Sequence, residues 1–199
     1  MDADSQLAQA CSGDRRSREA LFARHCDKLR PYVEYRLGRA LALRVEVDDV
    51  IQETFVRAWR DIAGATFSGD SAFFGWLVAI ARNVIVDIAR ASRSEKRQGE
   101  ALRLERSAWS RVGSIDPADS GAGPRTRAAT NEISARMNTA FRTLAPQHRR
   151  VIALRQFEQR SAREAAPQLG CSEQAVHALF RRALDAWAKL LEREGVDVP

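Results

Sequence analysis

Apolar residues recur at intervals of three and four along almost the whole chain, and no stretch alternates apolar and polar residues convincingly. One example is the series Val50, Phe55, Ala58, Trp59 and Ile62. Because an α-helix completes a turn about every 3.6 residues, such spacing gives each segment one apolar face. The sequence therefore predicts an all-α fold.

Two helical domains are expected, joined by a flexible linker. Residues 1–97 and 131–199 carry the helical pattern, and a chain of 199 residues is long enough for each part to bury its own core. Residues 98–130 lose the pattern and are interrupted by Pro117, Gly121, Gly123 and Pro124. A segment of this composition buries too little apolar surface to order itself, so it is interpreted as the linker.

The first domain is expected to hold a short opening helix that stops at residues 12–14, followed by helices near residues 18–37, 49–62 and 72–92. Pro31 removes a backbone donor, so it predicts a kink or a break in the helix of residues 18–37. In the helix of residues 49–62, the apolar face predicts that Gln52, Glu53, Val56 and Arg60 point outward.

Charge favours a polyanionic partner. The net charge is +6 and the pI is near 9.9, and Lys and Arg gain affinity by displacing counterions from phosphate. The longest apolar run, residues 73–81, is shorter than the ~20 residues of a membrane helix. The N-terminus also lacks the pattern of a signal peptide. These features predict a soluble cytoplasmic protein without direct membrane insertion.

Neither a metal site nor a cofactor is expected. The three cysteines, Cys11, Cys26 and Cys171, are widely spaced and never form a CxxC pair. His25 lies beside Cys26, but no second pair completes a tetrahedral set. An enzyme is the least favoured class, since no nucleophile pair or phosphate loop accompanies the acidic residues, and no catalytic residue is assigned.

The C-terminal residues have the pattern of a helix-turn-helix. Ser161 and Glu164 form a capping-box start, and Gly170 supplies the left-handed turn. Ala166 and Val176 lie where the motif needs a small contact residue and a packing residue. An ordinary helical hairpin is the alternative. The residues on the face that would enter a major groove are Ser172, Gln174, His177, Ala178, Arg181 and Arg182.

Two parts of the chain, one in each predicted domain, resemble a known family. An acidic helix start at residues 48–60 is followed by a polar loop, Phe67–Ser71, and by an aromatic helix that reaches Arg82 and Asn83. This order resembles regions 2.2 to 2.4 of the extracytoplasmic-function (ECF) sigma factors. Residues 144–151, with the helix-turn-helix after them, resemble region 4 of the same family. The resemblance implies a subunit that binds core RNA polymerase and directs promoter-specific transcription initiation.

The resemblance also implies roles for individual residues. It implies three partners: core RNA polymerase through its β′ clamp helices and β flap, promoter DNA, and an anti-sigma factor. The residues matched to polymerase binding are Asp49, Gln52, Glu53 and Val56. Those matched to the minus-10 element are Phe67, Ser68, Gly69, Asp70, Ser71, Arg82 and Asn83. The six groove-facing residues of the helix-turn-helix match the minus-35 element.

The chain departs from the family pattern in its recognition helix and elsewhere. His177, Ala178 and Leu179 stand where members usually carry a basic residue, Ser and Arg. Pro167 interrupts the first helix of the motif, and Ala79 replaces an Arg found in some members. The main rival interpretation is an ordinary helix-turn-helix repressor or activator, which would need a dimer to bind two half-sites.

Overall fold

The computed structural model describes residues 3–98 and 124–195. Every regular element in these residues is a helix, which confirms the predicted all-α fold. The chain divides into two compact units, residues 1–29 with 36–121 and residues 30–35 with 122–199. Most of the predicted linker, residues 99–123, lies outside the described residues.

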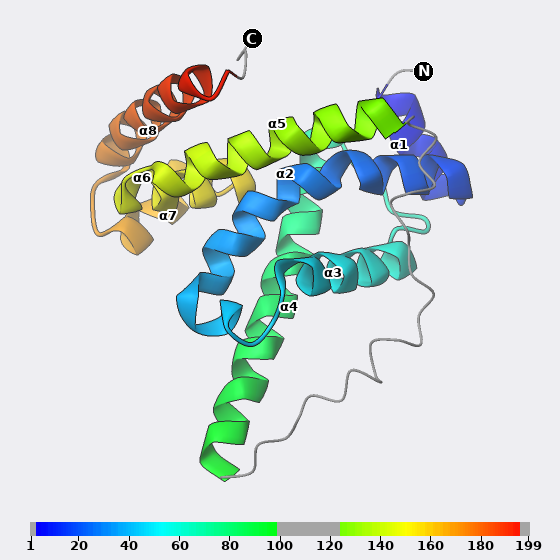
Figure 1. Cartoon of the computed structure of the whole chain (residues 1–199), viewed down its shortest axis with the longest axis horizontal. Helices are drawn as coiled ribbons and strands as arrows, with labels where there is room; N and C mark the ends of the chain where they lie inside the picture. Colours follow the sequence, from blue (N-terminus) through cyan, green and yellow to red (C-terminus); the bar gives the residue numbers. More distant parts are fainter. Residues whose placement is uncertain (1–2, 99–123, 196–199) are drawn as a thin grey trace. The chain divides into compact units, whose positions relative to one another are not determined.

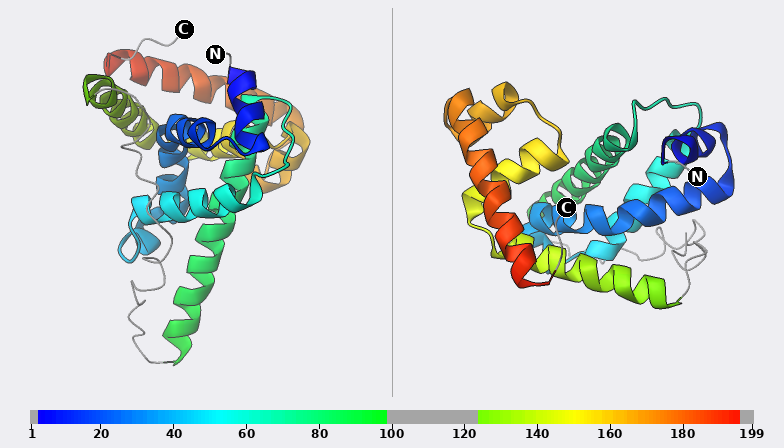
Figure 2. Two further views of the ribbon diagram at one scale, coloured as in Figure 1. Left: turned by 90° about the vertical axis from the view of Figure 1, so that its right-hand side faces the viewer. Right: turned by 90° about the horizontal axis from the view of Figure 1, so that it is seen from above.

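Four helices, which run from blue to green in Figure 1, make up the first unit, apart from residues 30–35 of the second helix. They are α1 (Ala3–Ser12), α2 (Arg15–Ala42), α3 (Val47–Asp61) and α4 (Asp70–Gln98). The Asp14 carboxylate accepts a hydrogen bond of 2.8 Å from the backbone N–H of Ser17, which caps the start of α2. α3 and α4 pack against each other, as the views of Figure 2 also show.

The irregularity in α2 lies at Gly38 and not at Pro31. The helix runs through Pro31, and the residue with non-helical dihedrals is Gly38, at φ 59° and ψ 179°. The expected kink or break at the proline was therefore wrong. A glycine adopts positive φ without the steric penalty of a side chain, so the chain bends there at lower cost.

Aromatic rings from three helices form the core of the first unit. The ring centroid of Phe22 on α2 lies 5.2 Å from that of Phe55 on α3 and 6.0 Å from that of Phe73 on α4. Phe67, in the segment between α3 and α4, lies 5.4 Å from Phe73 and 5.2 Å from Trp76. Aromatic pairs at these separations add to the energy of apolar burial, so the segment before α4 is anchored to the core.

Val56 is buried, with 8% of its surface exposed, although its position on α3 predicted an outward side chain. Ile51 and Thr54 are also buried. The buried face of α3 is therefore wider than the single stripe expected from its apolar residues, because more than one neighbour covers it.

α4 contains one stretch, Asp70–Ser92, that is long and apolar enough to cross a membrane, with a mean hydropathy of 1.7. The apolar run of residues 73–81, which Gly75 interrupts, is shorter than this stretch and did not predict it. Core helices of soluble proteins pass the same test. About a third of this stretch, 33%, is buried in the protein, including Phe73, Leu77 and Ala81, which have no exposed surface. A single helix of this kind is weak evidence for a membrane span.

The second unit contains α5 (Pro124–Thr143), α6 (Pro146–Ile152), the π-helical turn η3 (Ala153–Phe157), α7 (Ala162–Leu169) and α8 (Glu173–Arg193). α5 begins at Pro124, so residues 124–130 of the predicted linker are helical. Pro146 occupies the first turn of α6, where its missing N–H would have had no helical partner.

The core of the second unit is organised around Phe141 of α5. Its ring lies 5.6 Å from Phe157 of η3 and 5.5 Å from Trp187 of α8. In η3 the N–H of Glu158 donates to the carbonyl of Ala153 at 2.9 Å, five residues back. This wide turn continues α6 and leaves Phe157 in the core, with 4% of its surface exposed.

Candidate functional site

A cavity of about 550 Å³ lies between α1 and the segment that joins α3 to α4. Three residues of the predicted minus-10 loop, Phe67, Ser68 and Gly69, line it. The other lining residues are Leu7, Ala8, Cys11, Ser12, Gly64, Ala65 and Thr66. The sequence did not predict that α1 lines this cavity, because the α1 residues are more than fifty positions away from the loop.

The loop is tied down on both sides. The N–H of Gly64 donates to the carbonyl of Cys11 at 3.2 Å, which joins the loop to α1. Gly64 and Gly69 both have positive φ, at 74° and 128°, a conformation that a residue with a side chain rarely adopts. Ser68 is exposed between them, while the Phe67 ring is held by Phe73 and Trp76. The cavity therefore combines an apolar wall with the hydroxyl-bearing residues Ser12, Thr66 and Ser68.

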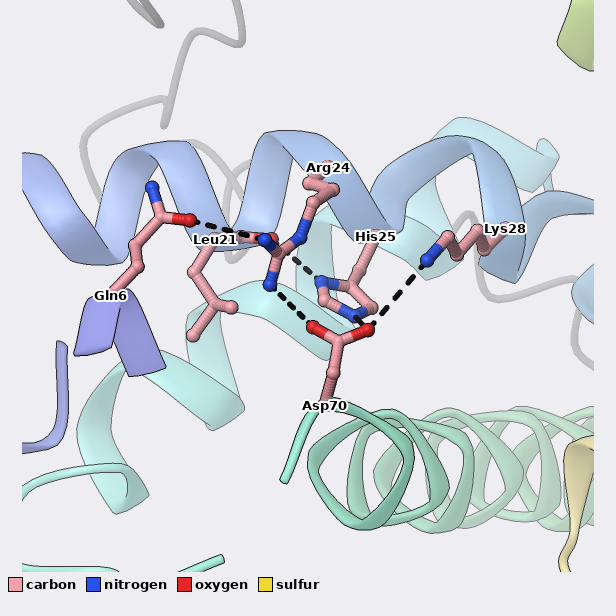
Figure 3. Close-up of polar contacts among 6 residues, drawn as sticks. All are labelled: Gln6, Leu21, Arg24, His25, Lys28 and Asp70. Atoms are coloured by element: carbon pink, nitrogen blue, oxygen red, sulfur yellow. Dashed lines mark hydrogen bonds and ion pairs between the residues drawn. The ribbon is translucent and has the colours of Figure 1, made fainter. Parts of the chain in front are cut away.

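Asp70, the first residue of α4, is held by three side chains of α2 (Figure 3). One carboxylate oxygen, Oδ1, accepts a hydrogen bond from Arg24. The other, Oδ2, lies 3.2 Å from Nε2 of His25 and 3.7 Å from Nζ of Lys28. Arg24 also donates to Oε1 of Gln6 on α1 at 3.2 Å. These contacts were not expected, since Asp70 was predicted to face DNA.

The His25 ring is completely buried and lies between two acceptors. Its Nδ1 is 2.8 Å from the carbonyl of Leu21, and its Nε2 faces Asp70. Burial lowers the pKa of His25, and the contact with Leu21 and the charge of Asp70 oppose this only in part. Burial acts to raise the pKa of Asp70, but the charges of His25, Arg24 and Lys28 outweigh it and lower that pKa. Asp70 is therefore ionised at neutral pH.

The remaining predicted minus-10 residues lie on α4. Ser71 and Asn83 are exposed, and Arg82 is half-buried. Asp70 and Asn83 are thirteen positions apart in the helix, which corresponds to about 20 Å along its axis. The structure does not bring these two side chains together.

The predicted polymerase-contact residues of α3 differ in their surroundings. Asp49 and Gln52 are exposed. Glu53 instead accepts a hydrogen bond of 2.8 Å from Nε of Arg57, whose Nη1 donates to Asp87 of α4 at 2.9 Å. The hydrogen bond to Glu53 is the main cause that raises the pKa of Arg57. Glu53 thus has a structural role whether or not it binds a partner.

The helix-turn-helix has the predicted local structure. Ser161 and Glu164 form both halves of the capping box at the start of α7, and Gly170 ends that helix at φ 67° and ψ 34°. The Ser172 hydroxyl caps α8 by accepting a 3.2 Å hydrogen bond from the N–H of Ala175. α7 remains helical through Pro167. The proline therefore does not interrupt the helix.

α8 exposes the residues that were predicted to face a DNA groove. Five of the six predicted groove-facing residues lie within α8 and are exposed, namely Gln174, His177, Ala178, Arg181 and Arg182. Val176 is completely buried, as the motif requires. Phe180 is half-buried, and the guanidinium of Arg155 lies 5.5 Å from its ring centroid. The exposed face has two guanidinium groups suited to phosphate and few groups suited to base edges.

Among the described residues, no three His, Cys, Asp or Glu side chains gather in a way that could hold a metal ion. His25, considered with Cys26 as a possible ligand pair, is engaged with Leu21 and Asp70.

Comparison with known proteins identifies the relatives of the chain. A family model described as ECF sigma factor matches residues 2–192. The RNA polymerase sigma factor CnrH of Cupriavidus metallidurans is 32% identical over 196 residues, which cover 97% of this chain and 96% of CnrH. The ECF RNA polymerase sigma factor BldN of Streptomyces coelicolor is 31% identical over 94% of this chain, which spans only 64% of BldN.

Two solved complexes also match. The structure of CnrH with the cytosolic domain of CnrY covers 96% of this chain and 99% of the matched chain, at 28% identity and a TM-score of 0.42. The RsbN–BldN complex covers 93% of this chain and 99% of the matched chain, at 26% identity and a TM-score of 0.34.

Proposed function

The chain belongs to the ECF sigma factor family, and on that premise we propose which of its surfaces bind core RNA polymerase and promoter DNA. A sigma factor directs transcription initiation, and the match across residues 2–192 includes both the loop with its cavity and the helix-turn-helix. The match over nearly the whole chain is the observation that best supports the proposed function. A repressor or activator would need only the helix-turn-helix.

The polymerase contact is proposed to lie on the exposed face of α3, against the β′ clamp helices. Asp49 and Gln52 are the exposed members of the predicted set and can form charge-assisted and amide hydrogen bonds. Glu53 can contribute its second oxygen, since Arg57 contacts Oε1. Val56 is buried, so its proposed part is to support the helix. The β flap is the expected partner of the second unit.

The minus-10 element is proposed to be bound by the cavity beside Phe67, Ser68 and Gly69. Its volume of about 550 Å³ lies in the range of sites that hold small organic groups. Extruding a base from the stack costs a few kcal/mol, which stacking and hydrogen bonds to the base edge can return. Arg82 and Asn83, farther along α4, are proposed to contact the strand at another nucleotide.

The minus-35 element is proposed to be bound by α8. Arg181 and Arg182 are exposed and suit phosphate, whereas Gln174 and His177 can reach base edges. Ser172 uses its hydroxyl to cap the helix, so its remaining contribution is a contact at the start of the groove-facing surface.

Regulation by an anti-sigma factor is part of this proposal, together with action as a cytoplasmic, non-catalytic protein that needs no cofactor and does not insert into a membrane. CnrH, which is 32% identical over nearly the whole chain, has been solved with the cytosolic domain of another protein, CnrY. We expect a dedicated protein partner for this chain as well.

Reconstituted transcription tests the proposal. Core RNA polymerase is mixed with the purified protein on genomic fragments, and start sites are mapped. New starts that share a minus-10 and a minus-35 element are expected only when the protein is present. Binding to such DNA as a dimer, with no effect on core polymerase, would instead establish the repressor or activator interpretation.

A further inference from the structure

Both oxygens of the Asp70 carboxylate are already used inside the protein. Oδ1 accepts from Arg24, and Oδ2 faces His25 and Lys28 (Figure 3). To accept a hydrogen bond from a base, Asp70 would have to give up partners that lower its pKa and keep it charged. Phosphates nearby would also repel a free carboxylate. This geometry fits an anchor better than a reader of sequence.

Arg24 connects the two walls of the cavity. Its guanidinium donates to Asp70 at the start of α4 and to Gln6 on α1. Leu7 and Ala8, which line the cavity, directly follow Gln6, and Gly69, which also lines it, directly precedes Asp70. A planar guanidinium with several donors suits this bridging task better than an ammonium group.

The anchor fixes the end of the loop that lies next to α4. One end is fixed by the bond from Gly64 to Cys11, and its middle by the Phe67 ring. Gly69, at the other end, has a φ of 128°, and glycine restricts the backbone least of all residues. Asp70 follows immediately and is clamped by α2, so the clamp compensates for the freedom of the glycine.

We propose that Arg24 and His25 are positioning residues for promoter reading: by holding Asp70 they fix the shape of the cavity, and Asp70 itself does not contact the base. This inference rests on the proposed role of the cavity in binding the minus-10 element. It reassigns Asp70 from DNA contact to loop anchor and adds two α2 residues on which base discrimination depends.

The test is a double-mutant cycle in reconstituted holoenzyme. Rates of open-complex formation are measured on a promoter and on derivatives with each minus-10 base replaced, for Arg24→Ala, Asp70→Asn and the double variant. We expect each single change to reduce the discrimination between bases about tenfold, because a displaced binding wall weakens every contact made on it. The double variant should lose no more than either single one.

Arg15→Ala is the matched control. Arg15 lies on the same helix and forms an ion pair with Glu19, at the exposed start of α2. Its removal should leave discrimination unchanged. Core polymerase affinity and the melting temperature are measured for every variant, and discrimination is compared at temperatures where all are folded. Asp70→Glu, which keeps the charge, should recover part of the lost discrimination, whereas a general loss of stability would not depend on the charge.

Three outcomes would overturn the inference. Loss of discrimination in Asp70→Asn with none in Arg24→Ala would make Asp70 a direct reader. Additive losses would mean that the two residues act separately. Unchanged discrimination in both, with a loss in Ser68→Ala, would leave the cavity as the binding site but remove the positioning role. If Ser68→Ala and Asn83→Ala also discriminate normally, the proposed minus-10 site itself fails.

Discussion

Arg57 and Asp87 are joined by a 2.9 Å ion pair between α3 and α4, while the same guanidinium also binds Glu53. Glu53 therefore faces two demands, since it was predicted to bind polymerase and it holds a residue that links two helices. A substitution at this position changes both, and its effect on polymerase binding needs to be separated from its effect on the fold.

Gln52→Ala should separate them. Gln52 is exposed on α3, so we expect the free energy of binding to core polymerase to weaken by about 1 kcal/mol, the value of one hydrogen bond. The melting temperature should not change. Glu53→Gln should weaken binding and also lower the free energy of unfolding by roughly 0.3–0.5 kcal/mol, typical of a helical ion pair between residues four positions apart. Fluorescence titration and urea unfolding measure the two quantities. Asp61→Asn, at the end of α3, is the control, and wild-type affinity in Gln52→Ala would contradict the assignment.

The recognition helix should contribute less than the minus-10 site. α8 exposes Ala178 where the family usually has a hydroxyl, so upstream recognition depends on few base contacts. Arg181→Ala should therefore reduce transcription more than Ala178→Ser, and scrambling the minus-35 element should cost less than scrambling the minus-10 element. Reconstituted transcription on the two scrambled promoters measures this. A greater loss from the upstream scramble would show that α8 reads bases better than its residues suggest.

Gly170→Ala should destabilise the second unit by about 1 kcal/mol, because φ at this position is 67°. Nothing lies within 4 Å of an added Cβ, so the loss comes from the backbone and not from a clash. Gly170→Asn should cost less, since Asn tolerates the left-handed conformation better. Urea unfolding of both variants provides the comparison, and equal stabilities for Ala and Asn would contradict the backbone explanation.

Stability should decrease as the pH falls below about 6.5, the ordinary pKa of histidine. The folded state lowers the pKa of His25, so the unfolded chain takes up the proton more readily and acid favours unfolding. The contribution of neutral His25 to the free energy of unfolding is complete above pH ~6.5 and is lost as the pH falls through the folded pKa of His25. Urea unfolding between pH 7.5 and pH 5 should show this slope in the wild type. His25→Gln, which cannot be protonated, should show a smaller slope, and identical slopes would exclude His25 as the cause.

The local features of the fold could be predicted from the sequence, because the residues that determine them are neighbours. The capping box of Ser161 and Glu164 and the turn at Gly170 depend on only a few adjacent positions. Pro31 shows the limit of such reasoning, since α2 stays helical at a residue that usually bends a helix.

The contacts that shape the cavity could not be predicted in the same way. Asp70 and Arg24 are 46 positions apart, and nothing in their immediate sequence indicates that they meet. The burial of Val56 likewise depends on which neighbours cover α3, which periodicity within one helix does not specify. Both features depend on how the helices are arranged in space. For this reason Val56 and Asp70, which were expected to bind partners, instead make contacts inside the protein.

The wide turn η3 gives the chain a place where its length can change. A π-helical turn holds one more residue between hydrogen-bonded groups than an α-helical turn does. Loss of one residue from Ala153–Phe157 can therefore convert η3 into a regular continuation of α6, whereas the same loss within α8 would rotate every later side chain by about 100°. A variant that lacks one residue of η3 can thus keep the same helix-turn-helix.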